Sequence, residues 1–242
     1  MATTEYIPVS FFPQGSGPPP ADRAQPKTHR QSNKKQVNHE LATQNAYMAR
    51  HMMCYTLRQE SIRVSGLTDG YDSTSPALNE ASFVESRLII ERMCTRLLAD
   101  HGDEVLDMIR GLDISDARLC GEFHKGAIQI VKSGVNPGRI AGLFLFAGLL
   151  AVRLHEEGQQ HKKIRSLVEW LNDILNEYLT DWLQGINGWG GIKTCMQEAA
   201  ANRLSQKQSS LTPAQPVEDR HKWMAWAAVG VGAFVVGALL SR

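Results

Sequence analysis

The sequence predicts an all-helical protein, and three observations support that class. Apolar residues recur at three- and four-residue intervals through most of residues 39–203, which is the periodicity of amphipathic helices. No stretch alternates apolar and polar residues between hairpin turns, so we expect no β-strands. The stretch from Pro137 to Val152 is apolar on every side except for one cation, Arg139, as in a helix that other helices enclose.

Composition and motif content exclude several classes of function. The 242 residues are 43% hydrophobic with a net charge of +1, so the chain can bury one substantial core and offers no broad basic surface to nucleic acid. We find no phosphate-binding glycine loop, nucleophile elbow or HExxH motif, and therefore predict no enzyme and no catalytic, cofactor-binding or metal site. The cysteines form no CxxC pair, and we interpret them as free thiols in a reducing compartment: Cys54, Cys94, Cys120 and Cys195.

Residues 1–38 are predicted to be a disordered arm. They are rich in proline, glycine, glutamine and basic residues and poor in residues that a core could use, which is typical of disorder. Met1 to Ser10 lacks the basic start and apolar core of a signal peptide. The basic residues of the arm could touch acidic lipid or nucleic acid, but we favour a solvated tail.

Helices are expected through the domain that follows, residues 39–203. The periodicity predicts helices over 39–64, 83–112 and 117–131, with a loop from Gly66 to Ser75 that Pro76 closes. Proline suits the first turn of a helix, so Pro137 predicts that another helix starts at about Asn136.

A helical hairpin is predicted at the centre of the domain. The apolar stretch from Pro137 is short for a membrane span, so we expect a buried core helix. Residues 162–183 carry apolar side chains on one face and polar ones on the other, and the segment 155–161 joins the two as a hairpin.

The carboxyl end predicts a membrane anchor. Residues 223–240 carry no charge, and 18 residues at about 1.5 Å each span roughly the hydrocarbon thickness of a bilayer. Residues 204–222 are polar and predict a linker. The alternative is a buried helix that ends the core. The anchor residues that we single out are Trp223, Trp226, Phe234 and Leu240.

Three short motifs resemble those of the Bcl-2 family of apoptosis regulators. "GVNPGRIAGLFLFAG" (134–148) resembles the first homology motif, "WLQGINGWGGI" (182–192) the second and "LLADHGDEV" (97–105) the third. They stand in the family's order, ahead of the predicted anchor. The resemblance implies a Bcl-2-like helical bundle around a central hydrophobic hairpin, with a C-terminal transmembrane helix and a surface groove that receives a partner's amphipathic helix.

The resemblance also implies roles for single residues. In the family, the arginine of the first motif meets an aspartate of the incoming helix, and here that arginine is Arg139; without the resemblance, a local cap or salt bridge within the chain would be preferred. Pro137 stands where the family has tryptophan. Trp182, Gly188 and Trp189 are expected to pack the last helices. The candidate groove residues are Val135, Asn136, Gly138, Arg139, Phe144 and Phe146. Some of them could instead be turn or core residues.

The third motif has two interpretations. It could act as a ligand helix for a relative if exposed, although cysteine and histidine are poor apolar anchors, or it could pack into its own fold as one wall of the groove, which we favour. Its residues are Cys94, Leu98, His101, Gly102, Asp103 and Val105.

Two opposed functions follow from the resemblance. The first is a pro-survival regulator that sequesters death-promoting relatives, and the second is a Bax- or Bak-like effector that oligomerises and permeabilises the mitochondrial outer membrane. A third hypothesis, from another class, is a membrane protein whose two apolar helices both span. The expected partners are Bcl-2 family proteins, in hetero- or homodimers, and membrane lipid, and we expect no binding to nucleic acid. We expect a tail-anchored protein on the mitochondrial outer membrane that faces the cytosol. It could also be located on the endoplasmic reticulum membrane or in the cytosol.

Overall fold

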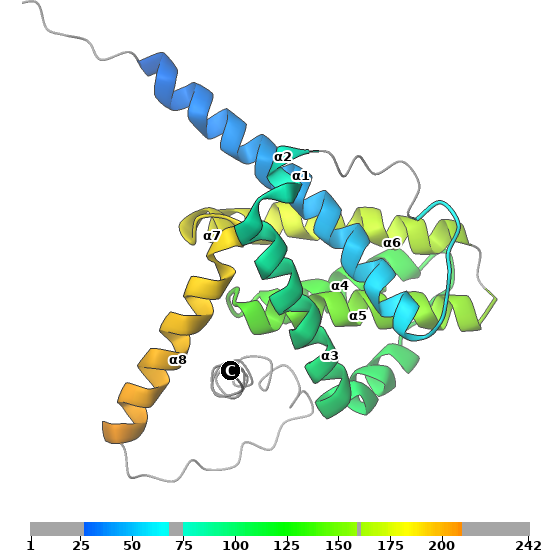
Figure 1. The fold of residues 1–242 in the computed structure, drawn as a ribbon. Coiled ribbons are helices and arrows are strands. Elements are labelled where there is room, and N and C mark those ends of the chain that lie inside the picture. Colours follow the sequence, from blue (N-terminus) through cyan, green and yellow to red (C-terminus); the bar gives the residue numbers. More distant parts are fainter. Residues whose placement is uncertain (1–26, 68–74, 159–160, 210–242) are drawn as a thin grey trace, which may run out of the picture. The chain divides into compact units, whose positions relative to one another are not determined.

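The computed structural model describes residues 27–67, 75–158 and 161–209, and all regular secondary structure within these ranges is helical (Figure 1). This confirms the all-α class. The predicted span 223–240 lies outside the described residues, as do its anchor residues Trp223, Trp226, Phe234 and Leu240. The elements are α1 (Lys27–Gln59), α2 (Pro76–Asn79), α3 (Ala81–Arg110), α4 (Leu119–Val131), α5 (Pro137–Glu156), α6 (His161–Ile174), the π-helical turn η1 (Leu175–Leu179), α7 (Thr180–Gly185), the 3₁₀ turn η2 (Trp189–Gly191) and α8 (Ile192–Ser209).

The chain divides into two units, Met1–Gln36 and Val37–Arg242. Of the first unit, the structure describes the opening residues of α1. The helix therefore begins inside the segment that the sequence predicts as a disordered arm. After Pro26 that segment contains neither proline nor glycine, so no residue in it interrupts a helix that continues into the core. Likewise α8 continues to Ser209, into the predicted linker.

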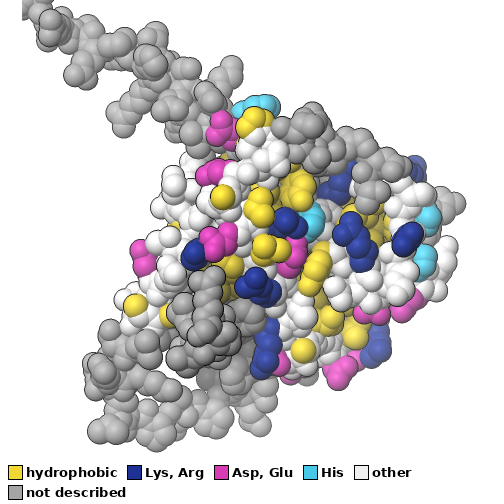
Figure 2. Space-filling model, in the orientation of Figure 1, with side chains coloured by type: hydrophobic (Ala, Val, Ile, Leu, Met, Phe, Trp, Pro, Cys, Tyr) yellow, Lys and Arg dark blue, Asp and Glu magenta, His cyan; other side chains and the backbone are white. Residues whose placement is uncertain are grey.

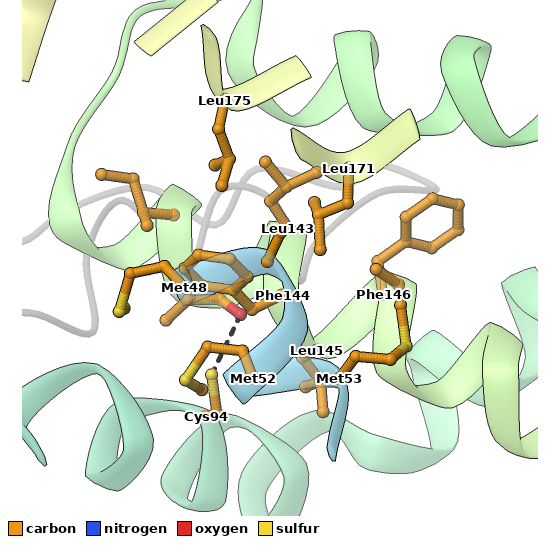
Figure 3. Packing of buried hydrophobic residues seen from close by; sticks show 14 of the residues in the cluster. Met48, Met52, Met53, Cys94, Leu143, Phe144, Leu145, Phe146, Leu171 and Leu175 are labelled. Carbon is orange, nitrogen blue, oxygen red and sulfur yellow. Dashed lines mark hydrogen bonds between the residues drawn. The ribbon is translucent and has the colours of Figure 1, made fainter. Parts of the chain in front are cut away.

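The core of the second unit surrounds α5. Sixteen of the twenty residues of α5 are buried, and α3, α4 and α6 pack against it. Among the described helices, α5 is long and apolar enough to cross a bilayer, yet its enclosure is that of a core helix, as the sequence predicts. Figure 3 shows methionines of α1, Met48, Met52 and Met53, packed with side chains of α5 and α6.

Two glycines allow helices to approach α5 closely. A methyl group on Gly148 would collide with the side chain of Thr56 in α1, and one on Gly126 in α4 would lie 2.6 Å from the ring of Phe146. Interiors packed to this density leave no space for an added carbon without movement of a neighbour. The glycines therefore set the spacing of α1 and α4 from the central helix.

A buried polar cluster ties α1 to the end of the bundle. Asn45 is fully buried; its Oδ1 accepts a hydrogen bond of 2.8 Å from Nε1 of Trp189, and its Nδ2 donates one of 2.9 Å to Oδ1 of Asn176. Trp189 belongs to the second motif and Asn176 to η1. Because a buried amide is stable only when hydrogen-bonded, Asn45 fixes both elements relative to α1.

Candidate functional site at the start of the central helix

The first turn of α5 holds Arg139 in place through a cap. Asn136 has extended backbone, and its Oδ1 accepts a hydrogen bond of 2.9 Å from the backbone N–H of Arg139. This is the geometry of an N-cap, in which a side-chain oxygen satisfies a free amide of the first turn. Pro137 occupies the first helical position, where no N–H is needed. Proline therefore allows the helix to begin here, although the family has tryptophan at this position.

Arg139 is half-buried and not enclosed in the bundle. Its Nη1 donates a hydrogen bond of 2.6 Å to the carbonyl of Gly134, which lies at φ 111°, a conformation that favours glycine. No carboxylate of the described residues forms an ion pair with Arg139. The local contact is therefore a backbone carbonyl that engages one nitrogen, and the other two nitrogens make no hydrogen bond within the described part of the chain.

The neighbours of Arg139 divide into accessible and buried residues. Val135 and Asn136 are partly exposed, whereas Gly138 is buried. Val135, Asn136 and Arg139 together make a small accessible area with one apolar group, one amide and one cation. A carboxylate approaching this area would meet the charge-assisted donors that such a group prefers.

Phe144 and Phe146 lie in the core. They are 1% and 0% exposed. The ring of Phe144 lies 6.2 Å from that of Trp189, and the ring of Phe146 is stacked 5.8 Å from that of Phe123 in α4. Of the two placements that periodicity left open, groove or core, the structure shows the core for both. Their contribution to the site is to support α5 beneath it.

The third motif packs into its own fold. Cys94 and Val105 are 2% and 1% exposed, and the Sγ of Cys94 donates a hydrogen bond of 3.4 Å to the carbonyl of Ala141 in α5 (Figure 3). Burial raises the pKa of the Cys94 thiol far above its ordinary value, so the thiol stays protonated. Gly102 is also buried, Leu98 and His101 are half-buried, and Asp103 is exposed.

The helix that carries this motif is kinked at its centre. His101 has φ −140° and ψ 15°, which are not helical values, so α3 consists of two helical segments that meet inside the motif. A ligand helix presents its anchors along one continuous face. The motif as folded does not have that continuous geometry, which agrees with the interpretation of core packing.

Sequence reasoning missed Arg153, which fastens the end of α3 to α5. Its Nη1 donates hydrogen bonds of 2.5 Å to the carbonyl of Ile109 and 3.0 Å to that of Leu112. Ile109 lies in the last turn of α3, where its carbonyl also accepts a hydrogen bond of 3.1 Å from the backbone N–H of Leu112, and Leu112 follows the helix. A basic residue in the last turn of an apolar stretch is consistent with this role, but its partners are distant in sequence.

Among the described residues, no group of three or more His, Cys, Asp or Glu side chains could hold a metal ion.

Comparison with known proteins agrees with this arrangement. The model of the family described as "Apoptosis regulator proteins, Bcl-2 family" matches residues 90–189, which contain the third and first motifs and most of the second. Bcl-2-like protein 1 of Gallus gallus is 27% identical over 153 residues, covering 60% of this chain and 62% of the relative, so the match spans less than two thirds of that protein. Bcl-2-like protein 1 of Rattus norvegicus is 24% identical over 198 residues, covering 76% of this chain and 81% of the relative.

Solved structures show the same fold. The crystal structure of chicken BOK superposes with a TM-score of 0.53 at 20% identity and covers 65% of this chain and 98% of that one. The crystal structure of Trichoplax adhaerens trBcl-2L2 bound to trBak BH3 gives a TM-score of 0.51 at 17% identity, covering 64% and 97%.

Fold and motifs together define a class: an all-helical bundle that encloses one apolar helix, with a cation held at the first turn of that helix. The chain belongs to the Bcl-2 family of apoptosis regulators.

Proposed function

We propose that this chain is a pro-survival regulator of apoptosis. It binds the amphipathic death-motif helices of pro-apoptotic relatives in a hydrophobic groove and so restrains permeabilisation of the mitochondrial outer membrane. The observation that carries the proposal is the state of Arg139. The residue is partly exposed, Asn136 caps its backbone N–H, and its guanidinium donates to the carbonyl of Gly134. No acid of the described residues forms an ion pair with it.

The chemistry of such a site suits an acidic group on an incoming helix. A guanidinium presents parallel donors to a carboxylate and thereby fixes the register of a helix whose affinity comes mostly from apolar anchors. Val135 supplies an apolar neighbour, and the Oδ1 of Asn136 accepts a hydrogen bond from the backbone N–H of Arg139, which fixes the start of α5. The hydrogen bond to Gly134 keeps the guanidinium in one orientation before binding, which reduces the entropy lost in the complex.

The names of similar proteins support a pro-survival role. Relatives include Bcl-2-like protein 1 and the apoptosis regulator Bcl-2 of Canis lupus familiaris, the latter 24% identical over 132 residues. One structural neighbour, trBcl-2L2, is bound to trBak BH3, and we infer that the present chain accepts helices of the same kind, with Bcl-2 family proteins as partners.

We also propose that residues 223–240 anchor the chain in the mitochondrial outer membrane with the helical domain facing the cytosol. The support is the uncharged length of this segment and its position after a polar stretch. Protease protection of the full chain on mitochondria tests it: the helical domain should be digested while a short carboxyl-terminal fragment survives.

Liposome permeabilisation separates the pro-survival proposal from its alternative. The alternative is a Bax- or Bak-like effector that oligomerises and permeabilises the membrane. Full-length protein is mixed with dye-loaded liposomes and an activating amphipathic peptide. Retention of the dye, together with micromolar or tighter peptide binding in calorimetry, supports the pro-survival role. Release of the dye would establish the effector role instead.

A further inference from the structure

Two side chains of kinds that bind metal ions lie one turn apart on the outer face of α4. Of the four cysteines of the chain, Cys120 is the exposed one, and His124 is half-buried. The Sγ of Cys120 lies 3.6 Å from the Nδ1 of His124. Residues four apart share one face of a helix, so a single ion can reach both groups. Thiolate and imidazole are ligands that Zn²⁺ prefers in proteins.

The separation of the two ligand atoms fits a tetrahedral zinc ion. Zinc binds thiolate sulfur at about 2.3 Å and imidazole nitrogen at about 2.0–2.1 Å, so a tetrahedral angle places the two atoms about 3.6 Å apart. The distance of 3.6 Å between Sγ and Nδ1 matches this edge of the tetrahedron. Cys120 and His124 therefore occupy two of the four positions of a zinc site without any change in the backbone of α4.

Zinc binding would replace one local hydrogen bond. The Nδ1 of His124 lies 2.9 Å from the carbonyl of Cys120, to which it donates in the tautomer that carries its proton there. When Nδ1 binds zinc, this proton moves to Nε2, and the proton of the Cys120 thiol passes to solvent. The carbonyl keeps the backbone N–H of His124 as its helical partner. No acceptor is therefore left unpaired by the exchange.

The histidine and carboxylate cluster between α1 and α3 is a poorer candidate, because its charges already balance. His51 Nε2 lies 2.6 Å from Glu91 Oε1, and Arg87 Nη1 lies 2.8 Å from the same oxygen. Desolvation alone would raise the pKa of Glu91, but the hydrogen bond and charge of His51 and the charge of Arg87 outweigh it and hold the pKa below its ordinary value. A guanidinium next to the carboxylate opposes the approach of a metal cation.

One chain supplies half of the zinc shell. Structural zinc takes four protein ligands, and within the described part of a single chain no third His, Cys, Asp or Glu joins such a pair. A second copy related by a twofold axis brings the same two ligands to the ion and completes a Cys₂His₂ tetrahedron. Gly121 is exposed, and a methyl group there would meet nothing within 4 Å. This face of α4 therefore has room for the α4 helix of a second copy.

A shared ion joins two copies without a large apolar interface. Specific interfaces without a metal bury about 1,200–2,000 Å². On the face shown in Figure 2, hydrophobic side chains are interspersed with basic, acidic and histidine side chains. Beside the pair on α4, the half-buried Trp170 of α6 lies with its ring 6.2 Å from that of His124 and supplies one apolar neighbour. The ion therefore provides most of the attraction between the copies.

We propose that Cys120 and His124 of two copies bind one Zn²⁺ and that this ion joins the copies through α4. Neither ligand belongs to the site at Arg139, so the inference does not rest on the proposed function.

Metal titration of the full-length protein in detergent tests the site. The protein is kept reduced with a phosphine, freed of metal with a chelator and titrated with Zn²⁺ or Co²⁺. We expect one Zn²⁺ per two chains and a dimer that zinc tightens by about a hundredfold or more, as measured by sedimentation. Bound Co²⁺ should show the strong visible absorption of a tetrahedral site and a thiolate-to-metal band. Addition of the chelator should reverse both effects.

Variants assign the ligands. Cys120→Ser and His124→Gln should each weaken zinc binding by about a hundredfold or more and remove the zinc-dependent dimer. The matched controls are Cys195→Ser in α8 and His155→Gln in α5, both at half-buried positions, and these should bind zinc like the unaltered protein. The proposal is overturned if Cys120→Ser binds zinc as before, if one ion binds per chain without association, or if Co²⁺ shows no thiolate band.

Discussion

At the scale of single residues, a few polar side chains decide how the bundle is organised. Arg139, Arg153, Asn45 and Glu91 each bind a group that is distant from their own helix turn or held by a loop. Hydrogen bonds of buried polar groups contribute modestly when made but cost much when one partner is removed. Substitutions at these positions should therefore have effects that depend on burial rather than on charge alone.

Asn45 should be needed for stability. Asn45→Leu removes the acceptor of the Trp189 indole and the donor to Asn176, which leaves two polar groups unsatisfied and should lower the free energy of unfolding by about 2–4 kcal/mol. Urea unfolding followed by tryptophan fluorescence measures this. Gln184→Leu, which removes an exposed hydrogen bond to Asn38, is the control and should stay within about 0.5 kcal/mol. Equal effects of the two substitutions would contradict the assigned role of Asn45.

Glu91 should make stability depend on pH in a defined direction. Its pKa is lowered in the folded protein, so the folded state binds fewer protons there than the unfolded state, and the stabilisation is complete above the unfolded pKa of about 4.3 and is lost as the pH falls through the lower folded pKa. Relative to Glu91→Gln, the original protein should be more stable by about 1.5–3 kcal/mol at pH 7. Urea unfolding of both proteins should show this difference shrinking steadily below about pH 4. A difference that is constant down to strong acid would rule out an ionised Glu91 as its cause.

At the scale of elements, the close packing of α1 against α5 depends on Gly148. Gly148→Ala would place a methyl group against the side chain of Thr56 and should destabilise the protein by about 1–3 kcal/mol, despite alanine's better helix propensity. Gly121→Ala in α4 is the matched control, because a methyl group there meets nothing within 4 Å and should leave stability unchanged or raise it by up to about 1 kcal/mol. Thermal unfolding of both variants checks the comparison, and a Gly148 variant as stable as the control would show that α1 can move aside freely.

Sequence periodicity predicted the elements whose apolar stripe is regular. The expected helix 83–112 is α3, and the expected start near Asn136 is the cap of α5. Periodicity could not reveal the kink at His101 or the π-helical turn η1, because both depend on partners from distant segments: α3 bends over α5, and η1 brings Asn176 to Asn45. The short helix α2 was missed because four residues carry no periodic signal.

The candidate site was predictable in part. The cap by Asn136 and the accessible position of Arg139 follow from local sequence, since proline and asparagine define the start of the helix. The depth of Phe144 and Phe146 was not predictable, because a helix that is apolar all round does not indicate which side meets α4, α6 or the surface. The contacts of Arg153 with Ile109 and of His51 with Glu91 were not foreseen either, since the partners lie about 40 residues apart in the chain.

At the scale of the whole molecule, the fold does not by itself decide whether the protein restrains or promotes apoptosis. Chains only 17–20% identical to this one share its fold, which shows how little of the sequence the bundle requires beyond its apolar pattern. The family is therefore assigned by the family model and the curated relatives together with the fold. Our proposal that the chain restrains permeabilisation therefore rests on the state of Arg139 and not on the fold alone.

The pairing of Arg139 with an acid of a partner helix is tested most directly by a double-mutant cycle in calorimetry. The unaltered protein and Arg139→Ala are each titrated with an amphipathic death-motif peptide and with the same peptide carrying alanine in place of its aspartate, with Arg58→Ala, at an exposed site of α1, as the control protein. We expect each single change to weaken binding by about 2–5 kcal/mol and the two together to weaken it by little more than one alone. Additive effects, or full affinity of Arg139→Ala for the original peptide, would contradict the account.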